Sequence, residues 1–333
     1  SIDAKKITDS KYEVFTEFGT KATGLCPKDW AKQAEDLGDK RGVSLAISRI
    51  GLIYSHRGDH EKGLEYYSRS LAIEEERGDK NGIALNLNNI ATMHLSKGEN
   101  DIALDNINRA YTIKKEIGDK NGMAINLMNT GIVYTKKGDY DKALDYYSRS
   151  LEICNEQGMM NSLAYGYNCV GWTSYQTGDY SKSLESSKKA LVIVEDLGHK
   201  EGMVLSFLCM GIAYWYKKDY KKTLEFLGRS LDIQKEVGYT PMELRTRIYY
   251  YLACKHLGKA YDTNKIYSIL ESDTDIDIDV NLKLFELLDD RSFLEAGYEQ
   301  VQAQASSMDD ELKEKFLSYP FPKVIIEEWE KEK

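Results

Sequence analysis

The stretch Gly118–Gln157, GDKNGMAINLMNTGIVYTKKGDYDKALDYYSRSLEICNEQ, contains one complete unit of a pattern that organises most of the chain. A shift of forty residues in either direction places this stretch on a near copy of itself, with no insertion between copies. The copies open at six glycines: Gly38, Gly78, Gly118, Gly158, Gly198 and Gly238. A fixed period of about 20 to 50 residues is typical of repeat arrays, so the sequence predicts a repeat architecture.

Each copy contains two segments with helical spacing. In the central copy, residues 121–137 and 140–156 each have an apolar face. Gly138 is expected to end the first helix, and Asp139 to cap the second by accepting hydrogen bonds from free amides. The unit is therefore predicted to be a helical hairpin. It is too small to bury its apolar face alone, whereas stacked copies bury this face continuously.

The copies share a set of columns when they are aligned. The first helix has Ile50, Ile90, Thr130, Val170 and Met210, then Gly51, Ala91, Gly131, Gly171 and Gly211, and then Tyr54, His94, Tyr134, Ser174 and Tyr214. The second helix has Gly63, Ala103, Ala143, Ser183 and Thr223, and then Tyr67, Ile107, Tyr147, Ser187 and Leu227. This order of apolar, small and aromatic positions resembles the tetratricopeptide repeat signature. The small residue is needed where the two helices approach most closely, and the aromatic ring fills the space toward the next unit.

The forty-residue period is longer than the usual period of about 34 residues. This long form is similar to the repeats of Pins-type polarity adaptors and, in the run Leu87–Ala91, to those of kinesin light chains. The resemblance implies an all-α fold, a right-handed superhelix of antiparallel helix pairs. Residues 1–37 are predicted to form an N-terminal helical cap or degenerate repeat, residues 38–270 six hairpins, and residues 271–333 a C-terminal helical cap. The C-terminal piece also looks like the region that closes such arrays in bacterial adenylyl cyclases and kinases.

Composition limits the classes of partner. The formal net charge is −9 and the pI is about 5.3, which disfavours nucleic acid and anionic membranes as partners. No apolar run approaches the roughly 18 residues of a membrane-spanning helix. The cysteines are odd in number, widely spaced and without a CxxC motif: Cys26, Cys154, Cys169, Cys209 and Cys254. We expect reduced thiols in a cytoplasmic protein.

No catalytic or metal-binding motif is evident. His56 and His60 are four residues apart but lie on either side of the predicted turn, so they do not share a helical face. Residues 275–279 alternate aspartate with isoleucine, as in the start of a calcium loop, but Val280 stands where such a loop needs glycine. We therefore expect an acidic linker there, no enzyme activity, no cofactor and no metal.

The remaining candidate site is the concave surface. The resemblance implies that the first helix of each hairpin lines an inner groove. Matching by column predicts these groove residues: Asn88, Thr92, Met128, Thr135, Tyr165, Asn168, Trp172, Tyr175, Leu208, Trp215 and Tyr216. The asparagine amides could hold the backbone of an extended peptide, and the large rings are of the type that dominates binding energy. Alternatively, the rings pack against neighbouring hairpins or the C-terminal cap.

These features predict a non-catalytic scaffold or sensor that binds a peptide or protein segment in the groove. The alternative is the regulatory arm of a bacterial signalling enzyme, an adenylyl cyclase or kinase, whose catalytic domain lies outside this sequence. A third option is a module for self-association.

Overall fold

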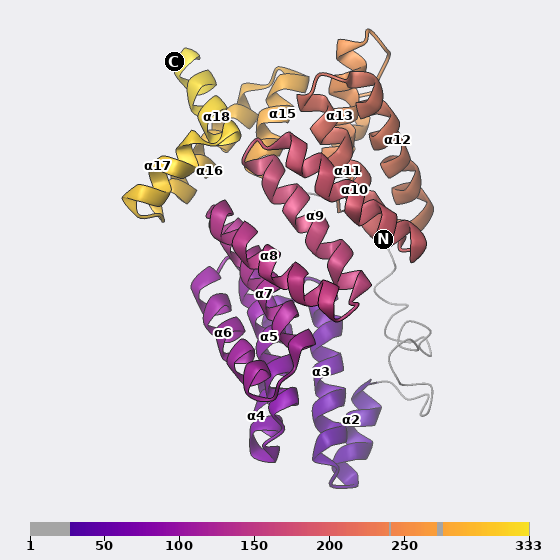
Figure 1. Cartoon of the computed structure of the whole chain (residues 1–333), viewed down its shortest axis with the longest axis vertical. Coiled ribbons are helices and arrows are strands. Elements are labelled where there is room, and N and C mark those ends of the chain that lie inside the picture. Colours follow the sequence, from indigo (N-terminus) through magenta and orange to yellow (C-terminus); the bar gives the residue numbers. More distant parts are fainter. Residues whose placement is uncertain (1–26, 240, 272–275, 333) are drawn as a thin grey trace. The chain divides into compact units, whose positions relative to one another are not determined.

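The computed structural model describes residues 27–239, 241–271 and 276–332. These residues form seventeen helices, α2 to α18, and no strand (Figure 1). The all-α repeat fold predicted from the sequence is confirmed. Of the N-terminal cap predicted over residues 1–37, residues 1–26 lie outside the described residues. None of the described helices is long and apolar enough to cross a lipid bilayer.

Five consecutive helix pairs follow the forty-residue period. They are α3 (Lys40–His56) and α4 (His60–Arg77), α5 (Lys80–Ser96) and α6 (Asn100–Glu116), α7 (Lys120–Lys136) and α8 (Tyr140–Glu156), α9 (Met160–Gln176) and α10 (Tyr180–Asp196), and α11 (Lys200–Tyr216) and α12 (Tyr220–Val237). A short helix, α2 (Pro27–Asp36), precedes them and packs on α3. In the sixth copy, α13 (Glu243–His256) is followed by α14 (Asn264–Leu270), which has only seven residues. The helical spacing in the sequence therefore predicts these helices well until the pattern weakens.

The C-terminal region is also helical. It consists of α15 (Ile278–Leu288), α16 (Arg291–Ser306), α17 (Asp310–Ser318) and α18 (Pro320–Lys331). The last helix begins at Pro320. Proline is tolerated in the first turn of a helix because the amide that it lacks would have no helical partner there.

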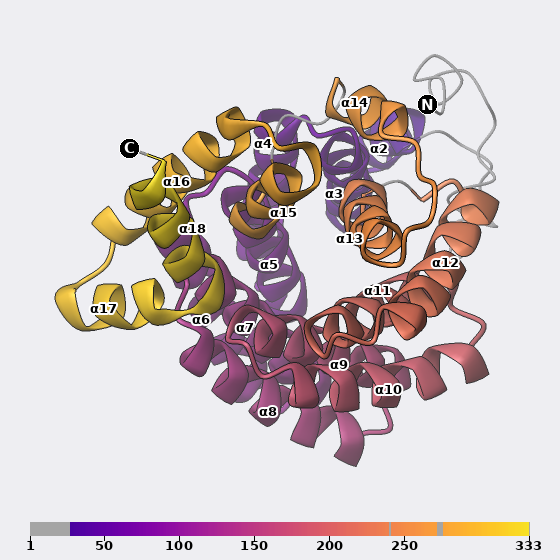
Figure 2. The ribbon, with the colours of Figure 1, turned by 90° about the horizontal axis from the view of Figure 1, so that it is seen from above.

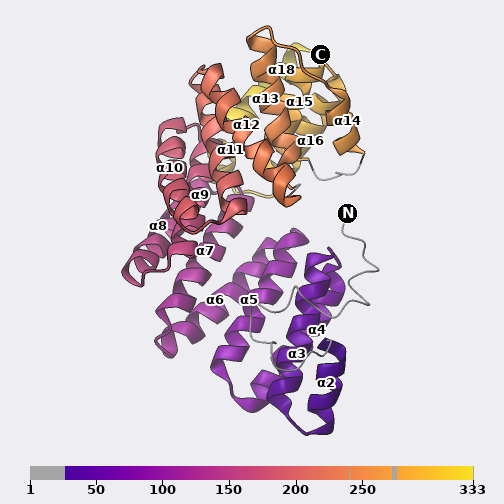
Figure 3. The same ribbon diagram turned by 90° about the vertical axis from the view of Figure 1, so that its right-hand side faces the viewer.

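The chain divides into two compact units, residues 1–126 and 127–333, with the boundary inside α7. In the first unit, α3 to α6 form two neighbouring antiparallel pairs (Figure 3). In the second unit, α13 and α15 lie on the side of α11 that faces away from α10 (Figure 2). The second unit therefore combines repeat hairpins with the C-terminal helices.

The turn between the helices of a pair has the predicted geometry. Gly138 has φ 76°, and the Asp139 carboxylate accepts a hydrogen bond of 3.2 Å from the amide of Lys142. In the fifth copy the same position is Lys218, with φ 60°. A left-handed conformation costs a non-glycine residue about 1 kcal/mol, so this turn is locally strained.

The small and aromatic columns meet inside each pair. A Cβ atom at Gly131 would lie 2.5 Å from the ring of Tyr147, a side chain that is only 2% exposed. The Tyr147 hydroxyl lies 3.0 Å from Thr135 Oγ1, so the buried ring still has a polar partner. The close approach of α7 and α8 therefore depends on glycine at this position.

Within the second unit, the last three helices return to the repeat hairpins. Gln304 Nε2 donates a hydrogen bond of 3.2 Å to the carbonyl oxygen of Lys136. Lys315 forms an ion pair with Asp141. The C-terminal helices thus pack against the ends of α7 and α8.

Candidate functional site

One face of the first helices meets solvent, and its centre is a column of apolar residues. Leu45, Leu85, Ile125 and Tyr165 are separated by forty residues each and are 40%, 51%, 45% and 49% exposed. On α5, the exposed residues on this face are Asn81, Leu85, Thr92 and Ser96. The open face is thus centred on the column of Leu45 and Leu85. The groove predicted from the sequence was centred on the column of Asn88, three residues later in each repeat.

The predicted groove column, which follows the exposed column by one helical turn, lies between helices. Met128, Asn168 and Leu208 are buried, and Asn88 is half-buried. Asn88 Nδ2 donates a hydrogen bond of 2.6 Å to Asn126 Oδ1 within the first unit. Thr92 remains exposed, and its hydroxyl donates to the carbonyl oxygen of Asn88 at 3.0 Å.

Two of the predicted aromatic residues, Tyr175 and Tyr216, contact the C-terminal helix α18, and a third, Trp215, packs against α12 and α13. Tyr175 is 1% exposed and Trp215 is 8% exposed. The ring of Tyr175 lies 4.9 Å from that of Phe321 in α18, and the ring of Tyr216 lies 6.1 Å from it. These rings belong to the core of the second unit rather than to an open groove.

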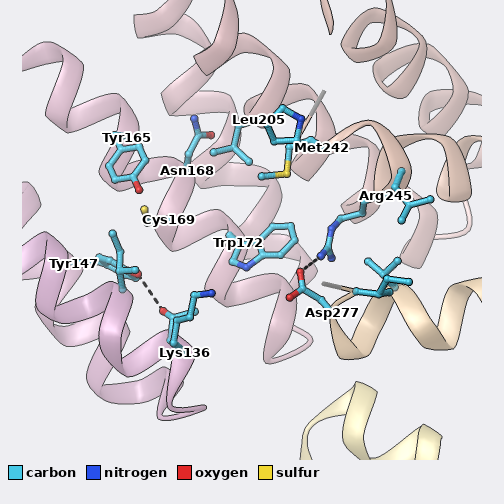
Figure 4. Close-up of a pocket in the computed structure, with 16 residues that line it drawn as sticks. Lys136, Tyr147, Tyr165, Asn168, Cys169, Trp172, Leu205, Met242, Arg245 and Asp277 are labelled. Carbon is cyan, nitrogen blue, oxygen red and sulfur yellow. Dashed lines mark hydrogen bonds and ion pairs between the residues drawn. The ribbon is translucent and has the colours of Figure 1, made fainter. Parts of the chain in front are cut away.

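The other predicted residues of the second unit surround a cavity. Thr135, Tyr165, Asn168 and Trp172 border an open space of about 380 Å³ (Figure 4). Its apolar wall includes Ile132, Leu205, Met242, Leu244 and Val280, and its charged groups are Lys136, Arg245 and Asp277. Small-molecule and peptide side-chain sites typically have this size and mostly apolar walls with few polar groups.

Arg245 carries the charge chemistry of the cavity. Its guanidinium forms ion pairs with Asp277 and Asp279 and lies 4.5 Å from the centroid of the Trp172 ring. Burial alone would lower the pKa of Arg245, but the two carboxylates outweigh burial and raise it. The guanidinium therefore remains charged and fixed in position beside Trp172.

The opposite end of the cavity is polar but uncharged. Tyr165 points its hydroxyl toward the sulfur of Cys169, and Trp172 lies between this pair and Arg245 (Figure 4). Burial raises the pKa of the Cys169 thiol to about 12. The thiol is thus protonated at neutral pH and is a weak nucleophile there.

The repeats can now be assigned to a family. The sequence matches the tetratricopeptide repeat family over residues 43–116, 82–156 and 122–196. Residues 43–196 of the chain are tetratricopeptide repeats.

Solved structures with the same tetratricopeptide fold include two Rap proteins. A Rap protein complexed with competence and sporulation factor has a TM-score of 0.61 and 16% identity, over 93% of this chain and 83% of that one. The Rap conjugation gene regulator of plasmid pLS20, in complex with the Phr* peptide, has a TM-score of 0.60 and 12% identity, over 96% of this chain and 81% of that one. BtubC from P. vanneervenii has a TM-score of 0.56 and 20% identity, over 65% of this chain and 91% of that one. At these identities the likeness is one of fold.

Sequence reasoning on the tetratricopeptide columns missed Leu205, Arg245 and Asp277. A signal for Arg245 was present, because the column that begins at Leu45 reads Leu45, Leu85, Ile125, Tyr165, Leu205 and Arg245. A charge at the last position of an otherwise uncharged column marks a departure from the repeat. The signal for Asp277 was the aspartate-rich stretch of residues 275–279, which was expected to be an acidic linker; in the structure Asp277 pairs with Arg245.

Proposed function

We propose that this tetratricopeptide repeat protein is a non-catalytic scaffold or sensor, and that a short peptide segment of a partner protein binds at the cavity of the second unit. The observation that carries the proposal is the cavity itself. It is a recess that extends from the exposed Tyr165 to the stacked pair of Trp172 and Arg245, with apolar walls and few charged groups. Such a recess suits one or two side chains of an extended segment.

The residues around the cavity are held in place before any ligand arrives. Asn168 Oδ1 accepts a hydrogen bond of 3.0 Å from the Ser206 hydroxyl, which fixes α9 against α11. Thr135 Oγ1 donates to the carbonyl oxygen of Gly131 at 3.0 Å. A preorganised receptor does not spend binding energy on its own ordering, so a short segment could bind with useful affinity. Asn168 then acts mainly by positioning α11, and the accessible surface is that of Tyr165 and Trp172.

Binding is favoured over catalysis by the state of the polar groups. Arg245 is engaged by two carboxylates, and the Cys169 thiol is held protonated. A general acid or base needs a pKa near the working pH and room to exchange a proton with substrate. The cavity therefore supports recognition of a ligand.

Two proteins of similar structure are consistent with this proposal. One Rap protein is described as complexed with competence and sporulation factor, and another as in complex with the Phr* peptide. Those ligands belong to those proteins. They support the idea that a helical array of this fold accepts a peptide.

The proposal is tested by selecting binders from a displayed library of short peptides and titrating them calorimetrically against the intact chain. We expect Trp172→Ala to weaken binding by at least tenfold, since large rings at the centre of an interface often contribute about 2 kcal/mol or more. Tyr165→Ala is expected to weaken it less, because its ring is half-exposed. The matched control is Tyr267→Ala in α14, which is equally exposed but does not line the cavity.

Circular dichroism would show whether each variant retains its helices. If a selected peptide binds with unchanged affinity to both cavity variants, the cavity is not its site. The regulatory-arm alternative stays a prediction, as do the cytoplasmic location and self-association.

A further inference from the structure

The uncharged polar side chains that line the cavity are bonded to other groups of the protein. The Thr135 and Tyr147 hydroxyls lie 3.0 Å from each other. The Asn168 amide accepts a hydrogen bond of 3.0 Å from α11 and donates one of 3.5 Å back to the same helix. The Tyr165 hydroxyl interacts with the Cys169 thiol. A polar ligand group in the cavity therefore has to compete for partners that are already engaged.

The charges at the cavity are balanced. Both terminal nitrogens of Arg245 bond to carboxylates, one to Asp277 and the other to Asp279, which is 2% exposed and is the internal counter-ion of Arg245. The remaining charged residue of the lining is Lys136, which is exposed at the end of α7 (Figure 4). Lys136 and Arg245 thus offset Asp277 and Asp279. The cavity offers no excess charge that would compensate an acidic or basic ligand group for its lost hydration.

The rest of the lining is apolar. Met242 and Trp172 both border the space, which has a volume of about 380 Å³ (Figure 4). This volume lies within the usual range of ligand pockets, about 300 to 1,000 Å³, so a large side chain fits. Thioether and aromatic groups pack favourably on apolar and aromatic ligands. The aliphatic part of the wall is formed by Ile132, Leu205, Pro241, Leu244, Ile276 and Val280.

We infer, on the basis of the proposed function, that the side chain of the partner segment that enters the cavity is large, apolar and uncharged, and that the cavity discriminates against polar side chains of similar length. The discrimination comes from the cost of removing a polar group from water where no partner replaces it. Leu205 is thus a specificity-determining residue, because an amide at this position would supply the partner that the wall lacks.

The experiment uses a pool of acetylated, amidated pentapeptides with all positions randomised, screened against the intact chain. Each position of the tightest binder is then replaced in turn by norleucine, glutamine, lysine or glutamate, four unbranched side chains that differ in polarity. We expect one position at which each polar side chain binds at least tenfold more weakly than norleucine. A tenfold change corresponds to about 1.4 kcal/mol.

Leu205→Asn is the test variant, because Leu205 is half-buried and the new amide can bond to a ligand amide. It should reduce the preference for norleucine over glutamine to threefold or less. If circular dichroism shows that this variant loses helicity, Met242→Gln, at the N-cap of α13, places an amide on the same wall. Leu197→Asn is the matched control, because Leu197 is 45% exposed and lies outside the cavity. The control should keep the tenfold preference.

The outcomes separate the two proposals. Binders that Trp172→Ala weakens but that accept glutamine, lysine or glutamate at every position would overturn the inference and leave the proposed function standing. The same holds if the preference for norleucine is unchanged in a folded variant with an amide on the wall. Binders with unchanged affinity for both Trp172→Ala and Tyr165→Ala would overturn the proposed function and the inference with it, as would a pool that yields no binder.

Discussion

The hydroxyl of Tyr175 donates a hydrogen bond of 2.7 Å to the carboxylate of Asp279, across 104 residues of sequence. The Tyr249 hydroxyl lies 2.7 Å from that of Tyr175, and Arg245 pairs with the same carboxylate. All of these groups are buried, so each depends on the others for its polar partners. This network connects α9 and α13 to the start of α15, and it fixes the wall of the cavity from behind.

The first prediction concerns that network. Asp279→Ala removes the internal counter-ion of Arg245 and leaves a buried charge without its main partner. Loss of one member of a buried pair typically costs about 3 to 5 kcal/mol, so we expect a clear fall in the urea midpoint of the transition that involves the second unit. Asp277→Ala is the control, because its side chain is 64% exposed and its loss should cost less than about 1 kcal/mol. Equal effects of the two changes would contradict the assignment of Asp279 as the internal counter-ion.

The second prediction concerns the strained turn of the fifth copy. Lys218 has φ 60°, where glycine has no steric penalty. Lys218→Gly should therefore stabilise the protein by about 1 kcal/mol, measured by thermal unfolding. Gly58→Lys is the reciprocal change, at φ 75° with open space around the position, and it should destabilise by a similar amount. A destabilised Lys218→Gly variant would show that the lysine side chain has another role.

The third prediction compares two glycines inside helices. Gly131→Ala places a Cβ 2.5 Å from the Tyr147 ring, so we expect a loss of about 1 to 3 kcal/mol. Gly228→Ala, in α12, places its Cβ 3.8 Å from the nearest side chain. There the higher helix propensity of alanine should stabilise by about 0.5 to 1 kcal/mol. Chemical denaturation of the two variants measures the contrast. Two changes of the same sign would reject the close approach of α7 and α8.

The fourth prediction concerns the Cys169 thiol. Its pKa is raised to about 12 because burial disfavours the thiolate. A raised thiol pKa lowers the thiolate fraction at any pH below it, so at pH 8 the reactive form is scarce. Iodoacetamide at pH 8 should label Cys169 more than a hundredfold more slowly in the folded protein than in urea, where the pKa is about 8.5. Peptide mapping by mass spectrometry gives the rate at this residue. Rapid labelling in the folded state would place the thiol at an open surface.

The sequence was sufficient for the repeat and its local chemistry. The turn at Gly138 and Asp139 and the contact of Gly131 with Tyr147 involve residues within one hairpin. These features follow from helical periodicity and from the space that each side chain needs, so a single copy contains the information. The family assignment depends on the same columns.

The sequence was less informative about the accessible face. The column of Leu85 and the column of Asn88 both satisfy the helical period, and only the packing of each helix on its neighbours decides which one meets solvent. Of the predicted groove residues, Tyr165 and Trp172 line the cavity, whereas Tyr175 and Trp215 are buried.

The forty-residue period by itself determined that the chain forms stacked helical hairpins, because each hairpin is specified by contacts between residues close in sequence. Only the tertiary structure decided that Asp279 pairs with Arg245, that Phe321 covers Tyr175, and that a cavity remains beside Trp172. These contacts join the repeats to a region with no repeat pattern. Their geometry depends on how non-local surfaces fit together, which no column of the sequence records.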